Sequence, residues 1–349
     1  MSDSIPVGVL GATGMVGQRF VSFLEGHPWF DLKWLGASDR SAGKRYHDAT
    51  SWRLHGPMPS YVRDLVVSES QPAEGVPKLL FSSMDASVAT EIEQAFAAAG
   101  HTVVSNSRNH RMDPDVPLMV PEVNAGHLRL LAEQHRLRGW KGQIVTNPNC
   151  STIVLVMALG ALKPFGIRKI MVTTMQAISG AGYPGVASMD INANVIPFIG
   201  SEEEKMESET QKILGEFTGA SIAPLAAPVS AQCNRVPVVD GHLITVSIEF
   251  EKKPTEAAIL AAWRGWRGVP QQRELPSAPP CPVIYMEEND RPQPRRDAER
   301  ENGMAVFTGR LRKCPVLDYK FIALGHNTVR GAAGAAVLNA ELMHSEGCL

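Results

Sequence analysis

Cys150 lies between a polar Asn-Pro-Asn turn and a long apolar run, in the stretch TNPNCSTIVLVMALGAL at residues 146–162. A cysteine that only fills a hydrophobic core is expected inside such a run, where it behaves as a small apolar side chain. If a helix begins at Ser151, the cysteine lies at its N-terminus, where the partial positive charge favours a thiolate. We therefore predict that Cys150 is a nucleophile, with a buried structural cysteine as the alternative.

A thiol nucleophile needs a proton partner, and His242 is the best placed of the ten histidines. It follows an Asp-Gly turn and directly precedes residues 243–250, LITVSIEF, whose alternation predicts a half-buried strand. A regular strand would hold the imidazole ring in a fixed direction. The alternative is that His242 is an ordinary surface or core residue.

Several charged residues have spacing that fits anionic ligands. Arg235 precedes a stiffening proline by two positions and could clamp a carboxylate with both guanidinium nitrogens. The segment SNSRNHR gathers Arg108, Asn109 and Arg111 after a predicted strand, at the edge where open α/β sheets bind ligands. From these residues alone, exposed surface positions remain the alternative reading.

The acidic run SEEEK at residues 201–205 predicts the start of a helix that extends to residue 217. Ser201 and Glu204 have the spacing of a capping box, which explains the acids without a ligand. Glu202 and Lys205 lie three residues apart and would share one face of that helix. Considered alone, the run indicates a solvated helix N-terminus.

A dinucleotide-binding turn is predicted near the N-terminus. Gly11, Gly14 and Gly17 form the pattern GxxGxxG between an apolar strand and an amphipathic helix, where free N–H groups can bind a pyrophosphate. The next strand ends in Ser-Asp-Arg-Ser at residues 38–41. The aspartate there would favour NAD, whereas Arg40 flanked by hydroxyls favours the 2′-phosphate of NADP, which we predict.

The order of elements predicts two domains. Strands at 32–35, 79–82 and 102–105, with a helix at 86–99, indicate a Rossmann-type doubly wound parallel sheet of the α/β class. From about residue 166, alternating strands indicate an α+β domain with a mainly antiparallel sheet. The small-residue helix at 327–347 is expected to return to the first domain. We therefore assign residues 1–149 plus 327–349 to the first domain and 150–326 to the second.

Composition excludes several classes of protein. The 34 Lys and Arg nearly balance the 36 Asp and Glu, so no global field is available to bind nucleic acid or an anionic membrane. No apolar run reaches the roughly 18 residues that span a bilayer, and we expect a cytoplasmic protein. The five cysteines are scattered without a CxxC pair, which argues against disulfides and structural zinc. We predict no metal site.

Taken together, the chain resembles the archaeal and fungal-type branch of the aspartate-β-semialdehyde dehydrogenase family. The strings that carry the resemblance run through most of the chain: GATGMVGQRF, SNSRNHRMDPDVPLMVPEVN, NPNCST, QAISGAGYPG, EEEK, NRVPVVDGH and GHNTVRGAAG. The resemblance implies a fold like that of glyceraldehyde-3-phosphate dehydrogenase. It also implies NADPH-dependent reduction of 4-phospho-aspartate to aspartate 4-semialdehyde, in lysine, threonine and methionine biosynthesis, by a homodimer or homotetramer.

The resemblance also assigns roles to residues. It makes Cys150 the nucleophile that forms a thioester and His242 the general acid and base. Arg235 would bind the substrate carboxylate and Glu202 its ammonium group, with the choice among the three glutamates open, and Gln176 would lie near the substrate. The phosphate-binding positions would be Arg108, Asn109 and Lys205. The cofactor-binding positions would be Gly11, Thr13, Gly14, Met15, Val16, Ser38, Arg40, Ser41, Ser83, Gly180 and Asn327.

Three alternatives share parts of this pattern. Malonyl-CoA reductase has the same scaffold and thioester chemistry with coenzyme A as the leaving group, and the Asn-Pro-Asn turn and the EEEK run distinguish this chain from it. N-acetyl-glutamyl-phosphate reductase has a different sequence around its cysteine. A regulatory protein that senses NADP without turnover would not need the thiol, the histidine and the charged residues together.

Overall fold

The first sheet of the protein is a six-stranded parallel sheet. The structure is a computed structural model that describes residues 4–349, so the first three residues of the predicted first domain lie outside it. Across the sheet the strands are β3 (Val67–Glu69), β2 (Phe30–Ala37), β1 (Ile5–Leu10), β4 (Leu79–Ser82), β5 (Thr102–Ser105) and β6 (Gln143–Thr146). This is the strand order of a dinucleotide-binding doubly wound sheet, so the predicted fold class is confirmed.

The glycine turn after β1 has the tight geometry that its sequence predicts. Gly11 has a φ of +73°, and a Cβ there would lie 2.8 Å from the carbonyl oxygen of Ser83. A Cβ on Gly17, in helix α1 (Met15–Phe23), would lie 2.3 Å from the carbonyl oxygen of Gly11. Side chains at these two positions would therefore push α1 away from the sheet.

The second sheet is mixed and also has six strands. Across it lie β10 (Val229–Arg235), β7 (Ile167–Gln176), β11 (His242–Phe250), β14 (Tyr319–Gly325), β13 (Val306–Lys313) and β12 (Val283–Met286). The four central strands are antiparallel, and each edge strand runs parallel to its neighbour. In β11 the even-numbered side chains are buried, and His242 shares this face with Ile244 and Val246.

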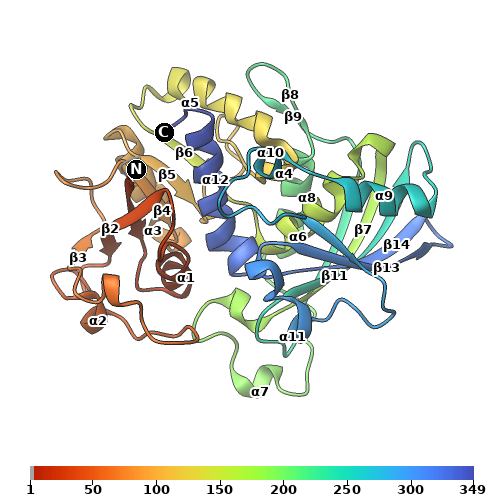
Figure 1. The fold of residues 1–349 in the computed structure, drawn as a ribbon, viewed down its shortest axis with the longest axis horizontal. Helices are drawn as coiled ribbons and strands as arrows, with labels where there is room; N and C mark the ends of the chain where they lie inside the picture. The colour runs from red at the N-terminus through yellow and green to blue at the C-terminus, as the bar shows by residue number, and fades with distance from the viewer. Residues whose placement is uncertain (1–3) are drawn as a thin grey trace.

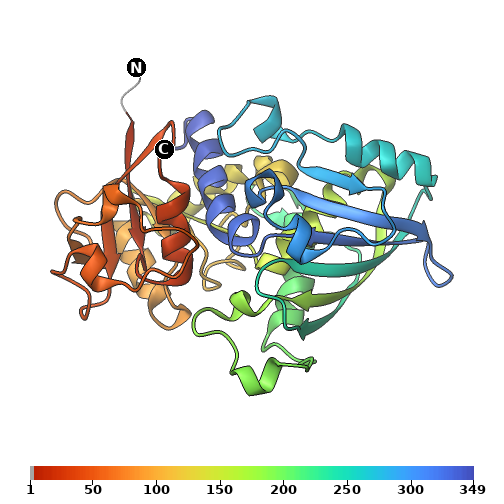
Figure 2. The same cartoon turned by 60° about the horizontal axis from the view of Figure 1, so that its bottom comes forward.

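Helix α6 (Cys150–Gly160) connects the two sheets. It follows β6 after three residues and packs against β11 and β14 of the second sheet. Every residue from Ser151 to Leu159 is buried, which is typical of a helix enclosed on all sides. Both views show the two sheets side by side, with helix α12 (Gly334–Ser345) between them (Figures 1 and 2). The start of α6 therefore lies where the two sheets meet.

The remaining helices are short or lie on the outer faces. They are α2 (Tyr46–Ala49), α3 (Ala86–Ala98), α4 (Pro121–Asn124), α5 (Leu130–Arg138), α7 (Ser188–Ile191), α8 (Glu202–Ile213), α9 (Glu256–Gly265), α10 (Val269–Gln272) and α11 (Pro294–Asp297). Short two-stranded pairing joins β8 (Glu216–Phe217) and β9 (Ile222–Ala223). None of the helices in residues 4–349 has both the length and the apolar character needed to cross a bilayer.

Two sequence-based expectations about helix ends are wrong. Ser201 has a φ of +57° and its side chain makes no capping hydrogen bond, so the predicted capping box is absent from α8. That helix also ends at Ile213, because the chain turns there into the β8–β9 pair.

The C-terminal helix begins as a π-helix, Val329–Ala333, before α12. Its buried residues share a core with Val7 and Phe20, although the exact domain boundaries stay a prediction.

Candidate functional site

Cys150 is the first residue of α6, as the sequence predicts. Asn149 caps the helix, and its side-chain oxygen accepts hydrogen bonds from the N–H groups of Ser151 and Thr152 at 2.9 and 3.2 Å. The cysteine is only partly buried. A Cβ added to Gly331, in the π-helix, would lie 2.7 Å from the Cβ of Cys150. Because Gly331 has no side chain, there is space for the side chain of Cys150.

The structure brings His242 to Cys150. The ring atom Nε2 lies 3.1 Å from Sγ, and Nδ1 accepts the backbone N–H of Ala177 at 3.0 Å. Because Nδ1 is an acceptor, the neutral ring carries its proton on Nε2, which faces the sulfur. A second proton would have to sit on Nδ1, against the Ala177 N–H. The ring is therefore arranged as a hydrogen-bond donor to sulfur.

Burial governs the protonation of this pair. Burial raises the pKa of Cys150 to about 12, with a smaller contribution from the Glu202 carboxylate, whereas Arg111 and Arg235 act in the opposite direction. Burial also lowers the pKa of His242 to about 3, and the charge of Arg235 adds to this. Desolvation thus opposes the partial positive charge of the helix end, which favours a thiolate, so the thiolate at Cys150 stays a prediction.

Arg235 lies beside the same pair. Its side chain is buried and donates from Nη1 to the carbonyl oxygen of Ala177 at 2.8 Å. A Cβ on Gly180 would lie 2.9 Å from Nη1 of Arg235 and 3.1 Å from Cε1 of His242. Gln176 pairs with Arg235 across β7 and β10, and its buried Oε1 has no hydrogen-bond partner within residues 4–349. An orphaned acceptor here can receive a proton from a bound ligand.

Helix α8 supplies the acid that faces the cysteine turn. Oε1 of Glu202 accepts hydrogen bonds from the Asn149 side chain at 2.8 Å and from Lys205 at 3.2 Å. Glu203 instead accepts the backbone N–H of Cys233, and Glu204 is exposed. Of the three adjacent glutamates, Glu202 is thus the one directed at the residue that precedes Cys150.

Sequence reasoning missed Glu209 and gave too little weight to Arg111. Oε1 of Glu209 accepts from Arg111 at 3.0 Å, and Oε2 accepts the backbone N–H of Asn149 at 2.6 Å. Glu209 follows Glu202 by seven residues, two helical turns on the same face, so the spacing was a usable signal. The Arg111 side chain is buried, and its Nε has no hydrogen-bond partner in the described chain.

The structure places the two other residues of this segment differently. Arg108 is exposed, and no hydrogen bond of its side chain is seen in the described part of the chain. The Asn109 amide donates to the carbonyl oxygen of Ala86 at 2.8 Å and to Thr90 at 2.5 Å. Asn109 is thus directed to α3, and no contact in the structure joins it to Cys150.

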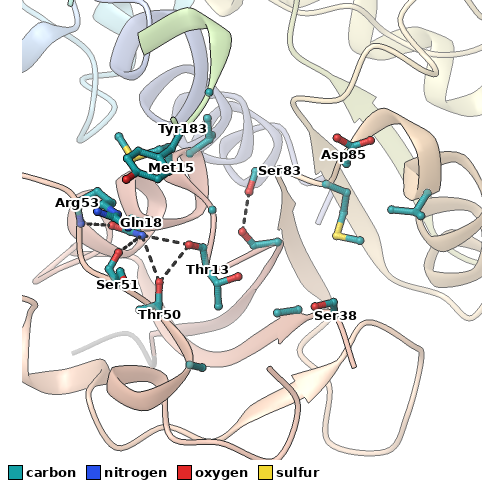
Figure 3. A pocket seen from close by; sticks show the side chains of 18 residues that line it. Thr13, Met15, Gln18, Ser38, Thr50, Ser51, Arg53, Ser83, Asp85 and Tyr183 are labelled. Atoms are coloured by element: carbon teal, nitrogen blue, oxygen red, sulfur yellow. Dashed lines mark hydrogen bonds between the residues drawn. The ribbon is translucent and has the colours of Figure 1, made fainter. Parts of the chain in front are cut away.

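An open cleft of about 710 Å³ lies above the glycine turn (Figure 3). Seven of the predicted cofactor positions line it: Gly11, Thr13, Gly14, Met15, Val16, Ser38 and Ser83. Further lining residues that no sequence pattern assigned to the cofactor include Thr50, Ser51, Arg53 and Tyr183. Arg40 and Ser41 lie on the turn after β2 and do not line the cleft, and Gly180 and Asn327 do not line it either.

The cleft fits the dinucleotide expected there. Gly14 caps α1 without a side chain, and the first turn of α1 contains no acid, so its N–H groups remain available to an anion. Asn327 connects the cleft region to the thiol site. It accepts the N–H of Gly241 at 2.8 Å and donates to Ser179 at 2.8 Å, which ties the turn before His242 to the loop that carries Gly180.

One cluster has the composition of a metal site. Asp240, Glu299 and His326 place ligand atoms within 4.8 Å of one another. However, Nδ1 of His326 accepts the N–H of Thr328 at 3.3 Å, so Nε2 carries the proton and donates to Glu299 at 3.1 Å. Arg19 lies 3.9 Å from Asp240. We interpret this cluster as hydrogen-bonded side chains beside a cation.

Comparisons with known proteins agree with this geometry. Residues 6–131 match the family described as semialdehyde dehydrogenase, NAD binding domain, and residues 159–330 match its dimerisation domain. The chain is 48% identical over 340 residues to the aspartate-semialdehyde dehydrogenase of Archaeoglobus fulgidus, covering 97% of this chain and 98% of that protein. It is 50% identical over 344 residues to that of Methanothermobacter thermautotrophicus, covering 97% and 99%.

The chain belongs to the aspartate-semialdehyde dehydrogenase family. A crystal structure of the aspartate semialdehyde dehydrogenase of Candida albicans with NADP superimposes with a TM-score of 0.92 at 41% identity, covering 99% of this chain and all of that one. A Vibrio cholerae relative complexed with ASA gives a TM-score of 0.78 at 27% identity, with 99% of each chain covered. The family, enzyme class and dinucleotide-binding domain predicted for this dehydrogenase are confirmed.

Proposed function

We propose that this dehydrogenase converts 4-phospho-aspartate to aspartate 4-semialdehyde and phosphate with NADPH, through a thioester on Cys150. The contact of 3.1 Å between Sγ and Nε2 of His242, at the N-terminus of a buried helix, carries the proposal. A nucleophile in hydrogen-bond contact with an imidazole that a third group orients is the arrangement of covalent catalysis.

The sulfur of Cys150 performs the covalent step. As the bond from the Ala177 N–H loosens, the ring proton of His242 moves to Nδ1 and Nε2 accepts the thiol proton. The sulfur then attacks the acyl carbon of the substrate, the carbon–oxygen bond to phosphate breaks, and phosphate leaves with the bonding electrons. Bound NADPH supplies the hydride that reduces the resulting thioester. The hemithioacetal then releases the aldehyde and returns the sulfur. Because desolvation raises the resting pKa of Cys150, the positive charges of Arg111 and Arg235 must favour the anion during turnover.

His242 acts through Nε2. At rest this atom donates a hydrogen bond to the sulfur, and the oxygen of the hemithioacetal is its next partner. The Ala177 N–H opposes a second proton on Nδ1, so full protonation of the ring requires that this bond of 3.0 Å loosen. We therefore propose His242 as the acid and base of the reaction, with its basicity held low until substrate is bound.

Charges around the sulfur match the charges of the substrate. We propose that Arg235 binds the carboxylate and that Glu202 binds the ammonium group, since both lie in contact with elements that hold Cys150 or His242. For the phosphate we propose Arg111 and Lys205. Arg111 replaces Arg108 here because it is buried and its charge reaches Cys150, whereas Arg108 is exposed.

The cleft above the glycine turn is proposed as the NADP site. Its lining agrees with most of the predicted contacts, and the Candida albicans relative with a TM-score of 0.92 was solved with NADP. Arg40 and Ser41 stay proposals for the 2′-phosphate, because their turn follows β2 next to Ser38.

We also propose a homo-oligomer formed through the second domain. Apolar side chains are exposed along the segment that contains α7, at the lower edge of Figure 1, where Met189 is 90% and Phe198 is 70% exposed. Single exposed apolar residues are ordinary, but several in one segment are typical of an interface. Light scattering of the purified enzyme would contradict this if it gave the mass of one chain at all concentrations.

The function is tested by offering both acyl donors. We expect reduction of NADP with aspartate semialdehyde and phosphate, and no turnover with malonyl-CoA. Turnover only with malonyl-CoA would select the coenzyme A reaction, and dinucleotide binding without turnover would select a sensor.

A matched pair of variants tests the phosphate site. Arg111→Ala should raise the KM for phosphate at least about tenfold, because a charged hydrogen bond to an anion is lost. Arg108→Ala removes the same charge three residues earlier in the segment and should change this KM less than twofold. Equal effects of the two variants would contradict the assignment of phosphate to Arg111.

A further inference from the structure

Arg53 has a charge that the cleft otherwise lacks. Among the residues of the described chain that line the cleft, it is the one cation, and Asp85 is the one anion. The glycine turn and the N-terminus of α1 provide only partial positive charge to a ligand with two phosphate groups. No family pattern or sequence motif used above pointed to Arg53.

The backbone of Arg53 is fixed beside the glycine turn. Gln18 of α1 is 1% exposed, and its Oε1 accepts the N–H of Arg53 at 2.7 Å. Its Nε2 lies 3.1 Å from the carbonyl oxygen of Thr13 and 3.0 Å from that of Ser51. Figure 3 shows these bonds joining α1, the glycine turn and the segment that carries Arg53. A further bond of 3.2 Å joins Nε2 to Oγ1 of Thr50, and a buried side chain with four partners leaves this segment little freedom.

The guanidinium of Arg53 stacks on a ring from the second half of the chain. Its central carbon lies 4.0 Å from the centroid of Tyr183, which is 61% exposed. Tyr183 follows Gly180 by three residues, and Gly180 lies against His242 and Arg235. The contact therefore links the mouth of the cleft to the loop that touches the thiol site (Figure 3).

We propose that Arg53 binds the pyrophosphate of the dinucleotide while Tyr183 holds its guanidinium over the cleft. This rests on the proposed NADP site. The pyrophosphate is the phosphate group concerned because the Gln18 bonds place Arg53 next to Thr13 in the glycine turn, whereas the 2′-phosphate is expected near Ser38 at the end of β2. A dinucleotide bound by Arg53 thereby holds Tyr183, and with it the loop of residues 178–185, against His242 and Arg235.

Calorimetric titration of the full-length enzyme with NADP and with NAD tests the assignment. Arg53→Ala should weaken both dinucleotides by the same factor, about tenfold or more, because both contain the pyrophosphate. Arg53→Lys should lose less, since it keeps the charge without the planar stack. Arg45→Ala, which removes an exposed arginine paired with Asp64 outside the cleft, is the matched control and should leave both affinities unchanged.

Tyr183→Leu tests the role of the ring. It should weaken binding less than Arg53→Ala, and the double variant should bind like Arg53→Ala alone, because the ring acts through the guanidinium. Hydrogen exchange should show residues 178–185 protected by NADP in the wild type and not in Arg53→Ala.

Two results would overturn the proposal: unchanged affinities in Arg53→Ala, or a loss for NADP alone, which would move Arg53 to the 2′-phosphate. If the wild-type enzyme bound neither dinucleotide, the proposed NADP site itself would fail, and this inference with it. If the wild type binds and the variant does not differ, only the Arg53 assignment fails. Because Arg53 is exposed, unchanged thermal unfolding of the variants is expected and separates a binding effect from misfolding.

Discussion

The thiol site and the dinucleotide cleft are built in opposite ways. Around Cys150, buried side chains from different elements hydrogen-bond to one another, as in the contacts of Asn149, before α6, with Glu202 and Glu209 of α8. The cleft has exposed walls, and its proposed anion-binding groups are the backbone N–H groups of one turn and the guanidinium of Arg53. Chemistry requires fixed geometry to a fraction of an ångström, whereas a flexible charged ligand can be bound by a polar surface that closes on it.

This difference has a consequence for mutations. A substitution at the thiol site should disturb several partners at once, so its effect falls on the rate. A substitution in the cleft should remove one contact, so its effect falls on dinucleotide affinity. Variants that separate these two quantities can therefore break or sharpen the comparison.

The largest effect is expected from removing the sulfur. Cys150→Ala should lower kcat by at least about a thousandfold, because no other group can form the thioester. Dinucleotide affinity, measured by calorimetry, should change less than twofold. Cys314→Ala removes a thiol outside the site and is the control. Loss of dinucleotide affinity in Cys150→Ala would show that the two regions are not separable.

The second-largest effect is expected in the pH dependence of Cys150 alkylation. Because burial raises the pKa of Cys150 to about 12, the thiolate fraction and the rate of alkylation by iodoacetamide should rise roughly tenfold per pH unit from pH 7 to 10. The pKa of Asp85 in the cleft is lowered by the Ser87 N–H, so dinucleotide affinity should stay flat over the same range. A plateau of alkylation near pH 7 would mean that a thiolate is present at rest and that the helix N-terminus outweighs burial.

The smallest of the three effects comes from a single methyl group. Gly180→Ala places a Cβ 2.9 Å from Nη1 of Arg235 and 3.1 Å from Cε1 of His242, so kcat should fall about tenfold to a hundredfold. The same change at Gly265, where a Cβ meets nothing within 4 Å, should leave kcat unchanged. If Gly180→Ala instead weakened dinucleotide binding alone, Gly180 would belong to the cleft, as its resemblance-based assignment states.

Local patterns predicted much of the fold. Strands at 79–82 and 102–105 agree with β4 and β5, and the alternation of residues 243–250 placed Ile244 and Val246 on the buried face of β11. The same alternation, extended by one residue toward the N-terminus, places His242 on that buried face as well. Predictions failed at helix ends, where Ser201 adopts a left-handed conformation that no residue spacing reveals.

The candidate site was predicted less completely because its contacts cross large distances in the sequence. Glu209 reaches Asn149 over 60 residues, and Arg53 meets Tyr183 from the other half of the chain. Arg108 and Arg111 have the same charge in the same segment, and burial alone distinguishes them.

The sequence by itself determined the residue types and the local backbone structure around them: a cysteine after a stiff turn, a histidine at the start of a strand, and glycines where a helix must approach a sheet. These follow from short-range sterics and from periodicity. The tertiary structure alone decided which arginine faces the sulfur, which ring nitrogen carries the proton and how far burial raises the pKa of Cys150. Those properties depend on desolvation and on partners distant along the chain, which become defined when the two sheets come together around α6.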